Sequence, residues 1–217
     1  MITFEDVKNN EEINAYIRAA DKVMDAIGYT EHSFAHVTRA AEQAADILDT
    51  LGYSERTREL AKIAGYMHDI GNAVNRHEHA LTGAVMAFRI LDNMDCPPED
   101  IATIVTAIGN HDEGTGVPVN AVAAALILAD KSDVRRSRVR NQAGDTFDIH
   151  DRVNYSVTAA KVHISEDTIK LSLTIDTTNS TLMEYFEIFL GRMMLCKKAA
   201  EALNVTFALV INGQKMM

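Results

Sequence analysis

The sequence predicts a mainly α fold, with a helical bundle over residues 1–145 and a small β-β-α-β unit over residues 146–217. Two observations support this division. Apolar residues recur every three or four positions as far as about residue 140, which is the period of helices that bury one face. After Gly144 the apolar residues alternate instead, which is typical of strands with one buried face. A chain of 217 residues is long enough for one medium domain and a smaller one.

The bundle helices are bounded by residues that favour helix ends. Gly28 and Gly52 follow the first two apolar stripes, Ser54 is a candidate N-cap, and Pro97-Pro98 suits a first turn. We expect helices over residues 13–27, 34–51, 55–69, 79–92, 98–108 and 119–138. The connections between them are short, as in a compact bundle.

The C-terminal unit begins with a predicted hairpin. Residues 160–164 and 169–175 alternate on either side of a Ser165-Glu166-Asp167 turn. Thr181 and Glu184 form a candidate capping box for a helix that runs to about residue 203, and residues 205–211 read as a last strand. This unit shows no catalytic motif, and we interpret its Met-rich and aromatic helix as core. A free strand edge would allow a homodimer.

Composition limits the classes of function. The net charge of −10 argues against general nucleic-acid binding, which favours basic chains, although a local basic pocket is compatible with it. No apolar run is long enough to span a bilayer, and the acidic start lacks the features of a signal peptide. Cys96 and Cys196 are the only cysteines and have no CxxC spacing. We therefore expect a reduced, cytoplasmic protein.

Six side chains have the chemistry of metal ligands, and they are His36, His68, Asp69, His79, His111 and Asp130. His111 continues the apolar stripe of Ile104 and Ile108, and Asp130 ends a very apolar helix. An unpartnered carboxylate in such a place would cost several kcal/mol, which a metal ion would offset. Bundle proteins build metal centres from inward faces of different helices. The sequence therefore predicts one or two divalent ions, from among Mn, Fe, Mg, Co, Ni and Zn.

The order of these residues resembles the HD-domain superfamily of metal-dependent phosphohydrolases. The H…HD…D pattern reads His36, then His68-Asp69-Ile70-Gly71, then Asp130, over roughly residues 30 to 140. The segment from His79 to Ala84 resembles the HxxxGA element of the binuclear branches, and His111 resembles their later histidine.

The resemblance implies a metal held by His36, His68, Asp69 and Asp130, with Asp69 bridging to a second metal on His79 and His111. His77 is an alternative to His79, but only His79 fits the spacing to Gly83, and His32 is expected beside the site. Asp112 and Glu113 either support His111 or line the mouth.

The chain also departs from the family pattern. Asn72 stands where many relatives have lysine, and Asn110 stands where HD-GYP proteins have the first of paired histidines. The fuller GYP segment is absent, so hydrolysis of cyclic di-GMP is not assigned.

The expected reaction is attack on phosphorus by a metal-activated hydroxide, with Asp69 as the bridging ligand. The substrate is expected to be a small phosphorylated molecule such as a nucleotide. Lys131 and Arg135 are four residues apart, so one helix face would present both to phosphate oxygens. Arg138 and Arg140 fit either this role or a solvated helix end.

Two other functions remain open from the sequence. The same ligands resemble the mixed-valent diiron oxygenases of the superfamily, which use dioxygen. A non-catalytic metal-containing nucleotide-sensing module is the other alternative. The complete ligand set argues against that module, while Asn72 in place of lysine keeps it open.

Overall fold

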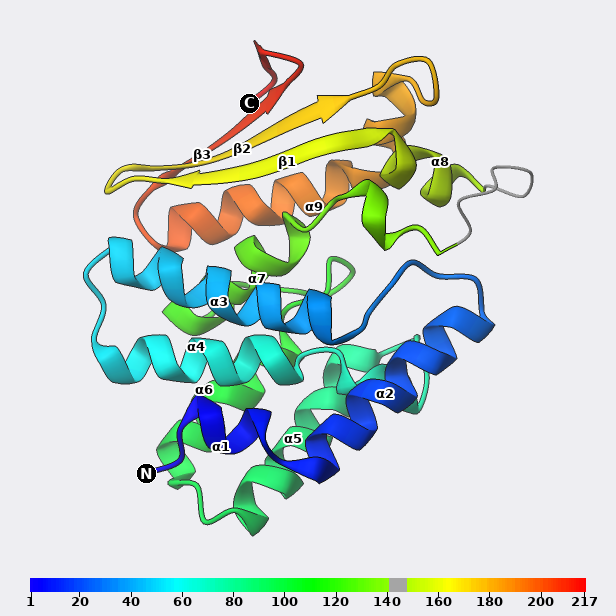
Figure 1. Cartoon of the computed structure of the whole chain (residues 1–217). Helices are drawn as coiled ribbons and strands as arrows, with labels where there is room; N and C mark the ends of the chain where they lie inside the picture. The colour runs from blue at the N-terminus through cyan, green and yellow to red at the C-terminus, as the bar shows by residue number, and fades with distance from the viewer. Residues whose placement is uncertain (141–147) are drawn as a thin grey trace.

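The computed structural model describes residues 1–140 and 148–217, and it confirms a helical bundle followed by a small sheet with a helix (Figure 1). The bundle contains α1 (Phe4–Lys8), α2 (Glu11–Ala26), α3 (Phe34–Thr50), α4 (Glu55–Met67), η1 (Ile70–Ala73), α5 (His79–Asn93), α6 (Pro98–Gly109), α7 (Ala121–Lys131) and η2 (Arg136–Arg138). Helix starts follow the expected chemistry, since the side chain of Ser54 accepts a hydrogen bond from the amide of Thr57.

One predicted helix is wrong in length. The expected helix over residues 119–138 ends at Lys131, and the chain turns through Ser132 into η2. A continued helix would need the carbonyl of Asp133 for its own ladder. The buried guanidinium of Arg138 takes that carbonyl at 2.9 Å and also binds the carbonyl of Glu31. Tertiary hydrogen bonds therefore outweigh the local helical pattern.

The C-terminal unit contains α8 (Ile149–Ser156), β1 (Val157–Ile164), β2 (Thr168–Ile175), α9 (Leu182–Ala202), β3 (Thr206–Ile211) and β4 (Gln214–Lys215). The strand order is β1-β2-β3-β4, with β1 and β2 antiparallel and β2 and β3 parallel. Because parallel neighbours need a crossover, α9 returns the chain across one face of the sheet. The predicted capping box of Thr181 and Glu184 begins this helix.

Helix α9 joins the two parts of the molecule. It lies between the sheet and the bundle and packs against α7 (Figure 1). Tyr185, Phe189 and Met193 on α9 are buried, and they belong to the same apolar core as the bundle residues. The predicted division at residues 145 and 146 lies outside the described residues. Over the ranges that the structure describes, no helix is both long and apolar enough to cross a bilayer.

Two glycines bring the segments that carry the candidate ligands close together. Gly71 in η1 packs directly on α5, so that a β-carbon there would overlap the carbonyl oxygen of His79 and lie 2.5 Å from the amide nitrogen of Gly83. Gly83 in turn faces the carbonyl of His68. Only a residue without a side chain allows this approach, which sets Asp69 beside the start of α5.

Candidate metal centre

The structure brings all six predicted ligands together inside the bundle. His36 lies in the first turn of α3, His68 and Asp69 follow α4, and His79 is the first residue of α5. His111 follows α6, and Asp130 lies in the last turn of α7. All six side chains are buried. Residues from five separate segments therefore converge on one point in the core.

The imidazole Nε2 atoms face the two carboxylates. His36 Nε2 lies 3.3 Å from Asp130 Oδ1 and 3.5 Å from Asp69 Oδ2. His68 Nε2 lies 3.2 Å from Asp69 Oδ2 and 3.6 Å from Asp130 Oδ1. The other Asp69 oxygen, Oδ1, lies 3.6 Å from His79 Nε2, which is 3.2 Å from the Nε2 of His111. Asp69 thus stands between the two groups of histidines.

The opposite ring nitrogen of each histidine has a fixed partner. His68 Nδ1 lies 2.7 Å from the carbonyl oxygen of Gly65. His111 Nδ1 lies 2.6 Å from the carbonyl oxygen of Ile108, and His79 Nδ1 lies 3.1 Å from that of Arg76. A carbonyl oxygen only accepts, so Nδ1 carries a proton in each ring, and Nε2 is the nitrogen left to bind a cation. This is how proteins orient imidazole ligands toward a metal.

Asp133 plays the same part for His36, because its Oδ2 lies 2.8 Å from the Nδ1 of that histidine. Asp133 follows Asp130 by three residues, and the analysis of the sequence missed it. Hydrogen bonds and ion pairs from His36, Arg135 and Arg138 hold the pKa of Asp133 well below its usual range against the effect of burial. The carboxylate therefore stays ionised behind the histidine.

The donor set fits a divalent cation. Among the described residues, the Nε2 atoms of His36 and His68 are buried and have no hydrogen-bond partner, which is costly unless a cation binds there. Burial alone would lower the pKa of His68, but the charges of Asp69 and Asp130 raise it to about 10. The two carboxylates thus favour a positive charge beside His68. Two groups of donor atoms lie close enough to hold a cation, namely His36, His68 and Asp130, and His68, Asp69 and His111.

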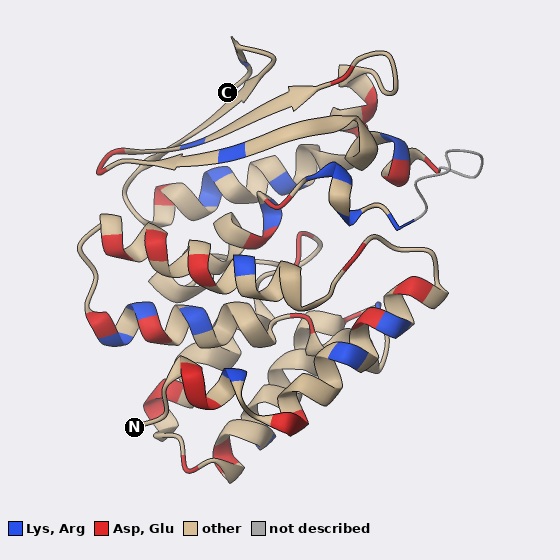
Figure 2. Cartoon of the chain, in the orientation of Figure 1, with Lys and Arg blue, Asp and Glu red and all other residues tan. Residues whose placement is uncertain are grey.

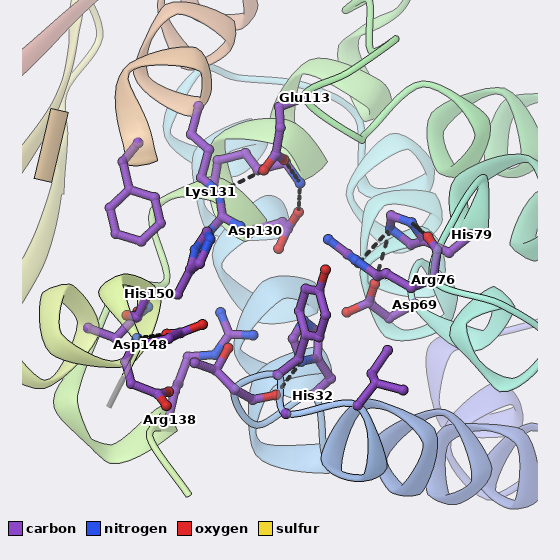
Figure 3. Close-up of a pocket in the computed structure, with 18 residues that line it drawn as sticks. His32, Asp69, Arg76, His79, Glu113, Asp130, Lys131, Arg138, Asp148 and His150 are labelled. Atoms are coloured by element: carbon purple, nitrogen blue, oxygen red, sulfur yellow. Dashed lines mark hydrogen bonds and ion pairs between the residues drawn. The ribbon is translucent and has the colours of Figure 1, made fainter. Parts of the chain in front are cut away.

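A cavity of about 400 Å³ opens onto these ligands (Figure 3). Asp69, His79 and Asp130 line its inner end, as does His32, the expected neighbour of the site. Its walls include four cationic side chains, which are Arg76, Lys131, Arg138 and Arg192. The outer part is formed by α8, through residues such as Asp148 and His150. The cavity combines buried carboxylates with a cationic wall.

Lys131 is held at this wall by a network of ion pairs. Its Nζ lies 2.7 Å from Asp130 Oδ2 and 2.8 Å from Glu113 Oε2, and Glu113 Oε1 accepts a hydrogen bond from Arg192 Nε at 2.9 Å. Burial opposes ionisation of both Lys131 and Glu113, but these pairs raise the pKa of Lys131 and lower that of Glu113. Glu113 therefore fixes Lys131, whereas Asp112 lies 3.9 Å from His79 Nε2.

The expectation that one helix face presents Lys131 and Arg135 is wrong, because α7 ends at Lys131. Arg135 lies outside the cavity, where it pairs with Asp133 at 2.8 Å and with Glu31 at 3.3 Å. Arg140 pairs with Asp21, away from the ligands (Figure 2 shows the basic segment between α7 and α8). His77 is exposed.

The cavity also contains residues that the sequence did not single out. Arg76 lies in the loop before α5, while Arg192 comes from α9 and His150 from α8. The last two belong to the unit in which no catalytic motif was found. No local spacing links them to the ligands, since α9 comes near through its packing on α7, and α8 through its contacts with η2 and α9.

A buried set of imidazoles and carboxylates at helix ends, open to a cationic cavity, defines a metal-binding helical-bundle protein. The family model of the HD domain matches residues 33–140, a segment that contains all six candidate ligands. The chain belongs to the HD-domain superfamily, and the predicted family is thereby confirmed.

The chain is also similar to known proteins. An uncharacterised protein of Methanocaldococcus jannaschii is 24% identical over 182 residues, covering 73% of this chain and 68% of that protein. The crystal structure of a predicted HD superfamily hydrolase from an uncultured Thermotogales bacterium shares 26% identity, covering 57% of this chain and 67% of that one, with a TM-score of 0.46.

Proposed function

We propose that this protein is a metal-dependent phosphohydrolase that cleaves a phosphoester or phosphoanhydride of a nucleotide or other small phosphorylated metabolite. The observation that carries the proposal is the cavity itself, where the ligand carboxylates Asp69 and Asp130 share one space with Lys131 and Arg192. Carboxylates hold divalent ions, and the nearby cations suit a phosphate group. Its volume of about 400 Å³ fits a small molecule.

The residues divide the work of the reaction. His36, His68, Asp69 and Asp130 would hold one metal ion, and His79 and His111 would hold a second that shares Asp69. Bound metal ions would supply a hydroxide at neutral pH and offset charge on phosphoryl oxygens. Asp133 and the carbonyls of Gly65, Arg76 and Ile108 keep the imidazoles in the binding tautomer.

Lys131 supplies a permanent positive charge at the cavity wall. Its ion pairs with Asp130 and Glu113 fix the ammonium group in place, so it is available to a phosphoryl oxygen without reorganisation. The wall around it excludes bulk water, because Lys131 and Phe189 are both buried. A fixed charge in such a place acts more strongly than one in solvent.

The test compares His79→Ala with His77→Ala in protein purified without chelators or a histidine tag. His79 lies in the centre, while His77 is exposed two residues away and serves as the matched control. We expect about two metal ions per chain in the parent and in His77→Ala, and about one in His79→Ala. Phosphate release from a panel of nucleotides and phosphomonoesters should fall only in His79→Ala.

Three other results would contradict the proposed function. A parent protein that is fully loaded with Mn, Co, Ni, Zn or Fe and releases phosphate from no member of the panel would not be a phosphohydrolase of this substrate class. Dioxygen consumption by the iron-loaded protein would assign the oxygenase reaction instead. Binding of a nucleotide without any turnover, retained in Asp69→Ala, would assign a sensing module.

A further inference from the structure

We propose that the side chain of Arg76 binds the phosphoryl group of the substrate at the His79 side of the metal centre. This inference deepens the proposed function and rests on it for the identity of the ligand. It concerns a residue that neither the sequence pattern nor the family comparison assigns.

Arg76 is the cavity cation whose charge is unpaired. Lys131 and Arg192 are bound to Glu113, and Arg138 lies 3.8 Å from Asp133. Arg76 takes part in none of the ion pairs found in residues 1–140 and 148–217. A half-buried guanidinium without a carboxylate is available to an anion from solution.

The guanidinium lies directly beside the candidate ligands. Arg76 Nη1 is 3.2 Å from His79 Nε2, and Figure 3 shows the side chain next to His79 and Asp69 and facing the cavity. Its Cζ lies over the ring of Tyr29, 5.4 Å from the centroid, and Tyr29 also lines the cavity. A phosphoryl group that reached the metal ions would thus meet Arg76.

The side chain of Asn72 connects Arg76 to Asp69 through hydrogen bonds. Its side-chain oxygen accepts a hydrogen bond from Arg76 Nη1 at 3.3 Å, while its amide nitrogen donates to Asp69 Oδ1 at 2.9 Å. Asn72 is fully buried, so these bonds have no competition from water. One amide therefore sets the position of Arg76 relative to the carboxylate between the two groups of histidines.

The contact between Arg76 and His79 can be exchanged. The lone pair on His79 Nε2 serves either an Arg76 N–H or a metal ion, but not both. With a cation on Nε2, the guanidinium keeps Asn72 and Tyr29, and its released N–H groups face the cavity. Two positive groups so close repel each other, and an anion between them removes the repulsion. A phosphoryl group, with several acceptor oxygens, has the right charge and geometry.

The backbone of Arg76 has a separate role, which makes the side chain testable. Its carbonyl accepts from His79 Nδ1, and the loop is held by bonds from Asn75 N to Gly71 O and from His77 N to Asn75 Oδ1. A substitution at Arg76 leaves all of these in place. The metal centre should therefore survive the loss of the guanidinium.

The experiment measures binding of inorganic phosphate to metal-loaded protein by calorimetry, for the parent, Arg76→Gln, Arg76→Lys and Arg89→Gln. Arg89 is an exposed arginine on α5 outside the cavity, so Arg89→Gln controls for the loss of one charge. We expect phosphate affinity to fall about tenfold to a hundredfold in Arg76→Gln. The phosphate affinity of Arg76→Lys should lie between those of the parent and Arg76→Gln, because lysine keeps the positive charge but loses the paired N–H groups of the guanidinium. Metal content should be unchanged in all four.

Equal phosphate affinity in Arg76→Gln and Arg89→Gln would overturn the inference. If Arg76→Gln loses metal or folded structure, the comparison of Arg76→Lys with the parent decides instead, and equal affinities there would overturn the inference. The two proposals also fail separately. Phosphate binding that depends on Arg76 in a protein without turnover refutes only the hydrolase, and turnover with unchanged kcat and KM in Arg76→Gln refutes only the role of Arg76.

Discussion

Asp69 shows how much chemistry one residue of this protein combines. It follows α4, faces His36 and His68 with one oxygen and His79 with the other, and accepts a hydrogen bond from Asn72. Although burial opposes ionisation, the neighbouring His68 holds the pKa of Asp69 well below its usual range. A carboxylate that stays ionised in the core is suited to bind cations on both sides.

The buried thiol of Cys196 should make the stability of the protein depend on pH. Burial raises the pKa of this thiol to about 12, whereas in the unfolded chain it would ionise near its ordinary value of about 8.5. The neutral thiol is therefore favoured in the folded state, and the unfolded state gains stability as the pH rises above about 8.5. Between pH 8 and pH 10 we expect Cys196 alone to lower the free energy of unfolding by about 1–2 kcal/mol.

Urea unfolding of the parent and of Cys196→Ala at pH 8 and pH 10 measures this effect. The contribution of Cys196 is the pH-dependent change in the free energy of unfolding of the parent minus that of the variant. Cys96→Ala is the control, because Cys96 is less deeply placed and its pKa is raised less. An identical pH dependence in the parent and in Cys196→Ala would show that the thiol ionises freely in the folded protein.

At the scale of the element, the contact between η1 and α5 depends on Gly71. Gly71→Ala should destabilise the protein by about 3 kcal/mol, because the added β-carbon meets backbone atoms of α5 that cannot move aside alone. Metal affinity should fall with it, since the same contact places Asp69 beside His79. Thermal unfolding and metal titration of the variant measure both effects.

Gly191 provides the matched control for this substitution. It lies inside α9 with open space where a β-carbon would stand, so Gly191→Ala should raise stability by roughly 0.5–1 kcal/mol. If Gly71→Ala were as stable as Gly191→Ala, the close approach of η1 and α5 would be wrong.

Helix α7 marks where local sequence pattern stops being informative. Its start and its apolar faces follow from spacing, as do the inward positions of His68, Asp69, His111 and Asp130, whereas His36 and His79 are assigned from the resemblance to the HD domain. The end of α7 at Lys131 does not follow from spacing, since residues 134 and 139 continue a helical spacing. The helix ends there because Arg138 binds the carbonyl of Glu31, more than a hundred residues away. A hydrogen bond to so distant a residue cannot be predicted from the sequence around α7.

At the scale of the whole molecule, the residues that line the cavity could not be predicted from local sequence patterns either. The hairpin, α9 and β3 could be predicted from alternation and a capping box. That α9 lies against α7, and so brings Arg192 to Glu113, depends on how the sheet packs on the bundle. The six candidate ligands could therefore be predicted from the sequence, whereas most of the cavity wall could not.

The shared core leads to a prediction about cooperativity. Because α9 packs on α7 and Arg192 is tied through Glu113 to Lys131, metal binding should stabilise both parts of the chain together. At a free metal concentration of 1,000 times Kd, the stabilisation should be about 4 kcal/mol. Calorimetry should show one unfolding transition that moves to lower temperature with a chelator. Hydrogen exchange should slow in β2 and β3, as well as in α4, when metal is added.

Two separate transitions, or protection by metal that is confined to residues 1–140, would contradict this prediction and favour two independent domains. His79→Ala provides an internal comparison, because it should reduce the stabilisation by metal without changing the number of transitions.

The spread of the six ligands along the chain, from His36 to Asp130, has a consequence for how the protein matures. During synthesis on the ribosome, a nascent chain that ends near residue 100 carries four of the six donors and lacks His111 and Asp130. The centre can be assembled only after α7 has emerged, and its cavity wall only after α9 has followed. Metal loading of the proposed centre would therefore be a late event, and the ions present around the finished chain would be the ones it meets.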